Sequence, residues 1–175
     1  TTTTMSKRAY PKLDLYSAYI ERLVDSSYSP NIPNVTTKIT LEFMNYALNL
    51  CDTWDTCMDI GGGSGHYLNA LATRFKKAIL VEVADMPEHK IITDRYKNIE
   101  VVNSFIENYQ TTTKVDFILL ADIYEHIKDI DSFVAKVSNL QAKGGVVYIM
   151  TPNPVSCGPA NESGLFHTIH PNGHI

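Results

Sequence analysis

The chain has 175 residues, 44% of them hydrophobic and 19% charged, and this composition is typical of one globular domain with a substantial core. No stretch is long and apolar enough to span a membrane and no signal peptide is evident, so we expect a soluble, cytoplasmic protein without a membrane partner. The net charge of −4 disfavours nucleic acid as the main partner. The three cysteines (Cys51, Cys57 and Cys157) lack metal-ligand spacing, which indicates buried thiols in a reducing compartment.

The N-terminal part of the chain is expected to be helical. We interpret residues 1–12, which begin with four threonines, as a disordered leader or an expression remnant. Apolar residues then recur at helical spacing from Leu13 to about Tyr28, and again from about Thr37 to Leu50. Two prolines separate these predicted helices. The first helix either packs against the domain or covers a ligand site.

A glycine-rich segment follows the second predicted helix. Residues 57–60 are a short, mostly apolar run that contains Asp59. Four glycines fill four of the next five positions: Gly61, Gly62, Gly63 and Gly65. Apolar residues then return at helical spacing, so the segment predicts a strand, a tight turn and a helix. Glycine permits a close approach of the backbone to a ligand, whereas a ligand-free helix cap would explain only one glycine. The spacing lacks the third glycine of a dinucleotide fingerprint and the Gly-Lys-Ser/Thr of a phosphate-binding loop.

Four further apolar runs predict the rest of a sheet, at residues 78–83, 99–102, 115–120 and 146–150. Helices are predicted over about residues 86–96 and 133–140, and Lys143-Gly144-Gly145 is predicted to stop the second of them. Glu82 stands near the end of the second predicted strand, seventeen positions beyond Gly65, at the edge where parallel α/β sheets bind ligands. A carboxylate there is suited to accept hydrogen bonds from ribose hydroxyls, and a solvated surface charge is the alternative.

Several of these segments, in this order, resemble the core of the class I S-adenosylmethionine-dependent methyltransferases. They are the Asp59-x-Gly-x-Gly-x-Gly run, Glu82, the Glu125-His126 segment, Lys143-Gly144-Gly145 and Thr151-Pro152-Asn153. The resemblance covers about residues 37–153 and is closest to the branch that includes the ubiquinone-biosynthesis O-methyltransferases. It implies an α/β fold, with a Rossmann-like, doubly wound and mainly parallel sheet of strand order 3-2-1-4-5, helices on both faces, and S-adenosyl-L-methionine as cofactor.

The resemblance also implies an acceptor class and a set of cofactor-binding residues. The acceptor is expected to be a small molecule that is methylated on oxygen or nitrogen. Asn103-Ser104 stands where the family usually carries Gly-Asp, so Ser104 is expected to contact the adenine more weakly than a carboxylate would. The expected cofactor-binding residues are Asp59, Gly61, Gly62, Gly63, Gly65, Glu82, Val83, Ser104, Phe105, Ala121 and Asp122.

Catalysis of methyl transfer needs an aligned acceptor and, for some acceptors, a base. Asp122, Tyr124 and His126 follow the fourth predicted strand, beside the expected position of the sulfonium. His126 is the candidate base, because histidine titrates near neutral pH. A histidine packed under the strand, with a purely structural role, is the alternative.

The chain is divided by these expectations into residues 1–12, a methyltransferase core with N-terminal helices over residues 13–154, and residues 155–175. The last segment is interpreted as a substrate-side loop or a truncated C-terminal segment, because the family ordinarily closes its sheet with two more strands and these residues are too few to form them. The exposed edge of the fifth strand is then expected to favour either self-association into a homo-oligomer or insolubility of a pure fragment.

Other functions stay open at this point. The domain could bind the cofactor or a partner protein without catalysis, whereas the glycine spacing disfavours a nicotinamide-dependent oxidoreductase. No metal site is predicted, because a proline and a glycine interrupt the C-terminal histidines His167, His170 and His174.

Overall fold

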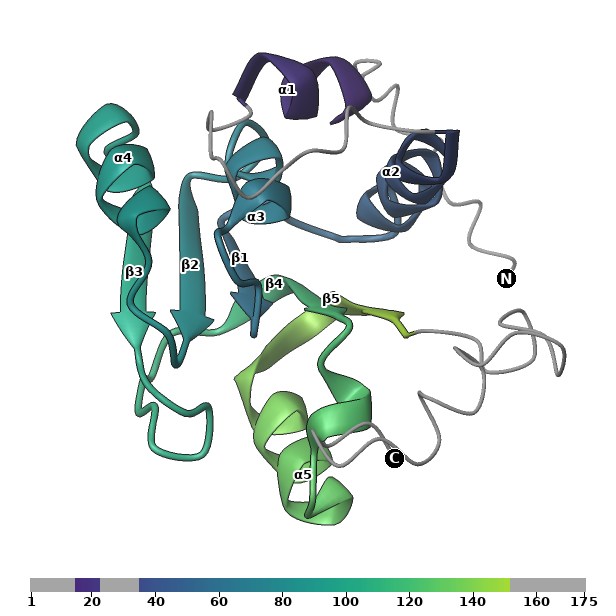
Figure 1. Cartoon of the computed structure of the whole chain (residues 1–175). Helices are drawn as coiled ribbons and strands as arrows, with labels where there is room; N and C mark the ends of the chain where they lie inside the picture. The colour runs from purple at the N-terminus through teal and green to yellow at the C-terminus, as the bar shows by residue number, and fades with distance from the viewer. Residues whose placement is uncertain (1–14, 23–34, 152–175) are drawn as a thin grey trace, which may run out of the picture.

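Five parallel strands form the centre of the computed structural model, which describes residues 15–22 and 35–151 (Figure 1). The strands are β1 (Thr56–Ile60), β2 (Lys77–Glu82), β3 (Ile99–Asn103), β4 (Val115–Ala121) and β5 (Gln141–Met150). Their order in the sheet is β3-β2-β1-β4-β5, and each neighbouring pair is parallel. The predicted fold class and strand order are confirmed. Every residue of β1 and β4 is buried, as expected for central strands that are covered on both faces.

Helices cover the two faces of this sheet unequally. They are α1 (Leu15–Arg22), α2 (Val35–Leu48), α3 (His66–Leu71), α4 (Pro87–Arg95), α5 (Ile130–Leu140) and a short 3-10 turn at Tyr124–His126. Figure 1 shows α5 on the opposite side of the sheet from α1, α2 and α3. A hydrophobic core lies on each face of the sheet, and the side chains of β1 alternate between the two cores. Cys57 packs with α1–α4, whereas Met58 and Ile60 pack with α5. None of the helices within the described ranges has the length and hydropathy to cross a membrane.

The first helix is tied to the domain by Arg22. Its guanidinium donates to the carbonyl of Asn69 at 3.0 Å and lies 3.9 Å from the centre of the Tyr96 ring. In return, the side-chain amide of Asn69 donates to the carbonyl of Arg22 at 2.6 Å. These contacts hold α1 over α3, which follows the glycine loop. The described part of α1 ends at Arg22, so the predicted extension to Tyr28 lies outside the described residues, as do residues 1–14 and 152–175.

The start of β5 differs from the prediction. We expected Lys143-Gly144-Gly145 to stop the preceding helix, but α5 already ends at Leu140 and β5 begins at once. The ladder is irregular there, because Val115 pairs with Gln141 whereas Phe117 pairs with Val146. The glycines therefore form an irregular stretch within β5, and Gly144 (φ +75°) packs against the side chain of Asp52. A Cβ at position 144 would lie 1.9 Å from that carboxylate, which explains the glycine by close packing.

A buried carboxylate makes hydrogen bonds at the end of the sheet where the parallel strands begin. Asp116, at the start of β4, accepts hydrogen bonds from the Thr53 hydroxyl at 2.5 Å and from the main-chain N–H groups of Asp55 and Thr56, each at 2.9 Å. The Cys51 thiol also donates to the carbonyl of Asp116 at 3.2 Å. These bonds connect β4 to the segment that joins α2 to β1, so the charge of this buried carboxylate is compensated.

Candidate functional site

The glycine loop leaves the carboxyl end of β1 and turns sharply before α3. The main-chain N–H of Gly61 donates to the carbonyl of Val81 at 2.8 Å, and the N–H of Gly65 donates to the carbonyl of Gly62 at 2.9 Å. Gly63 has φ +54°, and a Cβ added there would meet no atom within 4 Å. Gly65 has φ +78°, but a Cβ there would lie 3.0 Å from the side chain of Ile92. Thus Gly63 faces open space, whereas Gly65 permits close packing against α4.

Asp59 lies behind the glycine loop. Its side chain is completely buried, and neither carboxylate oxygen has a hydrogen-bond partner among the described residues. Burial raises the pKa of Asp59 to about 7, the charge of Glu82 adds to the rise, and the nearby N–H of Leu68 acts against it without a hydrogen bond of normal geometry. A Cβ at Gly62 would lie 2.3 Å from this carboxylate. Asp59 is not among the residues that line the two cavities described below, so its expected role in cofactor binding stays a prediction.

Glu82 reaches from the end of β2 to the loop after β1. One carboxylate oxygen accepts a hydrogen bond from the N–H of Gly63 at 2.9 Å, and the other accepts one from the N–H of Ala84 at 2.9 Å. A carboxylate has about four acceptor positions, so these two bonds leave room for two further donors. Asn103, at the end of β3, supports the same turn by donating to the carbonyl of Ala84 at 2.8 Å.

His89 is a second contact to the loop, and the sequence analysis did not identify it. This side chain is 4% exposed, on the first turn of α4. Its Nε2 lies 2.8 Å from the carbonyl oxygen of Gly63, and its Nδ1 accepts from the N–H of Met86 at 3.4 Å. Glu82 and His89 therefore hold the N–H and the carbonyl of Gly63, respectively.

Two adjoining cavities open at the carboxyl ends of the strands. The first, about 410 Å³, lies between the glycine loop, α1, the start of α4 and the end of β4. The second, about 590 Å³, lies between the ends of β2 and β3 and the segment after β4. Gly61 and Asp122 line both cavities. Because the chain leaves β1 and β4 toward opposite faces of the sheet, a crevice at this point is expected for such a fold.

Most of the predicted cofactor-binding residues line these cavities. Those in the first cavity are Gly61, Gly62, Gly63, Ala121 and Asp122. Those in the second are Gly61, Glu82, Val83, Ser104, Phe105 and Asp122. Asp59 and Gly65 line neither. The sequence analysis did not assign Tyr19, Ser64, His66, Tyr67 and Met86, which complete the lining of the first cavity. Tyr19 comes from α1 and packs against the rings of His66 and Tyr67, so α1 both packs on the domain and borders the site.

Asp122 adopts an unusual backbone conformation at the junction of the two cavities. It has φ +52°, which non-glycine residues seldom adopt, and its N–H donates to the carbonyl of Met150 at 2.8 Å. Partial burial raises the pKa of its carboxyl group, the charge of Glu125 adds to the rise, and His126 lowers it. Such a conformation at the mouth of a cavity is typical of residues whose position matters for function.

His126 lies in the 3-10 turn and is exposed, at the border of the second cavity. The side chain is therefore not packed under the strand, and whether its role is catalytic or structural stays a prediction. Its neighbour Glu125 accepts a hydrogen bond from the Thr151 hydroxyl at 3.2 Å, in keeping with a structural carboxylate. Among residues 15–22 and 35–151, no group of three or more potential ligands is arranged to hold a metal ion, and the C-terminal histidines lie outside these ranges.

Comparisons with known proteins give the family. The family model described as "Methyltransferase domain" matches residues 17–175. No curated protein matches the chain. Among solved structures, the N-methyltransferase NodS from Bradyrhizobium japonicum WM9 is similar, with a TM-score of 0.58 and 18% identity over 72% of this chain and 74% of NodS.

Two further structures have the same fold. An S-adenosylmethionine-dependent methyltransferase from Clostridium acetobutylicum ATCC 824 gives a TM-score of 0.55, with 20% identity over 68% of this chain and 50% of that one. Coclaurine N-methyltransferase, bound to N-methylheliamine and SAH, gives a TM-score of 0.54, with 18% identity over 70% of this chain and 39% of that one. The chain thus spans half or less of these two proteins. The family match and the shared fold show that this chain belongs to the class I S-adenosylmethionine-dependent methyltransferases.

Proposed function

We propose that the domain binds S-adenosylmethionine across the two cavities and transfers its methyl group to oxygen or nitrogen of a small molecule. The observation that carries this proposal is the pair of cavities that meet at Gly61 and Asp122. One is walled by loop backbone and the other by a carboxylate with spare acceptor positions, so they suit the amino acid part and the nucleoside part of one ligand.

The second cavity fits the adenosine part. Glu82 would accept hydrogen bonds from the ribose hydroxyls with the acceptor positions that Gly63 and Ala84 leave free. Val83 and Phe105 are 50% and 59% exposed at the border of this cavity, and an adenine ring would cover them. The hydroxyl of Ser104 donates to the carbonyl of Phe105 at 2.9 Å, so its lone pairs would accept from the adenine amino group.

The first cavity fits the methionine part. A side chain at Gly63 would project into unfilled space next to the loop, so this glycine leaves room for a ligand close to the backbone. Asp122 would supply negative charge near the ligand, which carries a sulfonium and an ammonium group. Tyr19 and Met86 would close the sides of the cavity.

The bound cofactor supplies an electrophilic methyl group, so the chain's own residues are needed mainly for alignment. The loop, Glu82 and Asp122 would fix the ligand relative to the open side of the cavities. Where the acceptor carries a proton, His126 is the candidate base, because it is exposed and stands after β4 close enough to lower the pKa of Asp122. A cytoplasmic location and self-association through the edge of β5 remain predictions.

The proposal is tested by calorimetric titration of the chain with S-adenosylhomocysteine, with NADH as the control ligand. We expect saturable binding of S-adenosylhomocysteine at one site and no competition from NADH. Binding of NADH alone, or of neither ligand, would contradict the proposal. A panel of phenols, catechols and amines, with radiolabelled methyl donor, then tests turnover; amines belong in it because two of the similar structures are N-methyltransferases.

A non-catalytic binding domain is the second candidate. The observation that favours it is Ser104, a neutral hydroxyl that stands where the family usually carries a carboxylate and is therefore the weaker acceptor for adenine. Binding of S-adenosylhomocysteine without methyl transfer to any member of the panel would support this second function.

A further inference from the structure

His89 uses both of its ring nitrogens, and the contacts specify its tautomer. The N–H of Met86 can only donate, so Nδ1, at 3.4 Å, is the acceptor. Nε2 then carries the proton and donates it to the carbonyl oxygen of Gly63 at 2.8 Å. The ring is 4% exposed, so water competes little for these contacts.

Gly63 is consequently held on both sides, through the two peptide groups that flank its Cα. Its N–H donates to Glu82 at 2.9 Å and its carbonyl accepts from His89 at 2.8 Å. Glu82 ends β2 and His89 stands in the first turn of α4, so the two partners flank the short connection between these elements. Because Gly63 faces open space with φ +54°, the orientation of these two peptide groups shapes the wall of the first cavity.

The same histidine also orders a second wall. Met86 is the N-cap of α4 and lines the first cavity, and His89 occupies the N3 position, from which Glu or Gln normally reaches back to the N-cap N–H. His89 itself lines neither cavity. One buried ring therefore connects two cavity walls that are far apart in the sequence.

We propose that His89 is a positioning residue that holds Gly63 and Met86 in the geometry that binds the cofactor. This inference rests on the proposed function, since it assigns the first cavity to the methionine part of S-adenosylmethionine. The imidazole acts through the backbone of both residues and makes no contact of its own with the ligand.

Two substitutions separate the two contacts. The amide nitrogen of Gln lies at about the reach of Nε2, so His89→Gln retains a donor for Gly63. The amide of Asn reaches only as far as Nδ1, so His89→Asn retains at most the contact with Met86. We expect His89→Gln, which loses only the long 3.4 Å contact with Met86, to bind S-adenosylhomocysteine within about twofold of wild type. His89→Asn, which loses the 2.8 Å contact with Gly63, should bind it roughly 2- to 12-fold more weakly, the effect of one lost hydrogen bond.

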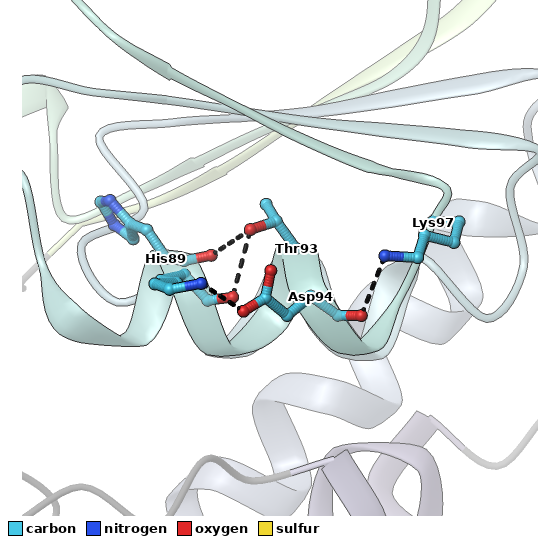
Figure 2. Close-up of polar contacts among 5 residues, drawn as sticks. His89, Thr93, Asp94 and Lys97 are labelled. Atoms are coloured by element: carbon cyan, nitrogen blue, oxygen red, sulfur yellow. Dashed lines mark hydrogen bonds and ion pairs between the residues drawn. The ribbon is translucent and has the colours of Figure 1, made fainter.

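Thr93→Val is the matched control on the same helix. The Thr93 hydroxyl forms a hydrogen bond to the carbonyl of His89 at 2.9 Å (Figure 2). The same hydroxyl also contacts the carbonyl of Lys90 at 3.2 Å. The substitution removes a polar contact inside α4 and leaves the glycine loop untouched. We expect unchanged affinity, with any effect confined to the melting temperature.

The positioning role would be overturned if the Gln and Asn variants lost affinity equally. It would also be overturned if, across all three variants, the loss of affinity were proportional to the fall in melting temperature. A second measurement needs no ligand. The ¹H–¹⁵N spectrum of the imidazole in the free protein should show the Nε2–H tautomer, and the Nδ1–H tautomer would overturn the contact between His89 and Gly63. If wild-type protein bound no S-adenosylhomocysteine, the proposed function would fail, while the tautomer would still decide whether His89 holds the loop.

Discussion

The buried Asp59 carboxylate gives a quantitative prediction about pH and stability. Its pKa in the folded chain is about 7, against 3.8 for an ordinary aspartate, because burial and the charge of Glu82 disfavour ionisation. Below the ordinary pKa both the folded and the unfolded chain hold the proton, so the group has no effect on folding. Between the two values the unfolded chain loses the proton first, and the free energy of unfolding falls as pH rises. Above about pH 7 the full penalty is present, at most about 4 kcal/mol at 1.4 kcal/mol per pH unit.

Asp59→Asn removes this titration while keeping the shape of the side chain. Urea unfolding of wild type and variant at pH 5 and pH 8 measures the effect. We expect the wild type to lose about 2–3 kcal/mol more than the variant over this interval. Other groups also titrate there, including His66, whose pKa is lowered by burial, but they are common to both proteins and cancel in the comparison.

Asp94→Asn is the control for this experiment. Asp94 is exposed and forms an ion pair with Lys90 at 2.6 Å, which lowers the pKa of Asp94. Replacing Asp94 should therefore leave the change in the free energy of unfolding between pH 5 and pH 8 as it is in the wild type. Parallel pH profiles for wild type and Asp59→Asn would refute the reasoning, because they would mean that Asp59 is ionised at little cost inside the fold.

Three further substitutions test the site. Glu82→Ala should weaken S-adenosylhomocysteine binding by about 1.5–3 kcal/mol, the usual value for hydrogen bonds to a charged group, and a calorimetric loss of only a few tenths would show a mere surface charge. Gly63→Val should abolish that binding in calorimetry while the circular dichroism spectrum stays folded, since no protein atom lies within 4 Å of the new Cβ and the strain of a valine at φ +54° costs only part of the stability; unaltered affinity would contradict a ligand-binding role of the loop. Gly65→Ala should instead lower stability by about 1–3 kcal/mol in urea unfolding, because its φ is +78° and its Cβ would crowd Ile92; a neutral result would show that the chain relaxes there freely.

The sequence predicts the sheet and the position of the Glu82 carboxylate for a clear reason. Continuous apolar runs such as that of β4 indicate strands covered on both faces, and an acidic residue at the end of such a run, as at Glu82, stands out from it. The position of Asp59 could not be predicted in the same way. A strand buried on both faces has no polar alternation, so nothing in the sequence indicates that Asp59 lies under the loop and not in a cavity.

The role of His89 is also invisible in the sequence. It is 26 residues from Gly63 and contacts a backbone carbonyl, so no motif connects the two positions. Likewise, the contribution of Tyr19 depends on how Arg22 docks α1 onto α3, which helical periodicity does not specify. The start of β5 was misjudged because a pair of glycines indicates a turn whether it ends a helix or interrupts a strand.

Asp116 at the opposite edge of the sheet has a further consequence. Its hydrogen bonds join the start of β4 to the segment before β1 at the edge remote from both cavities. The central strands β1 and β4 are thus held together at the end where no ligand is expected. The loops at the opposite ends of these strands can vary without weakening this contact. A chimera that keeps residues 51–60 and 115–121 but exchanges the loops after β3 and β4 should therefore retain a folded sheet. The contacts that join the central strands are thus separate from the loops that line the cavities.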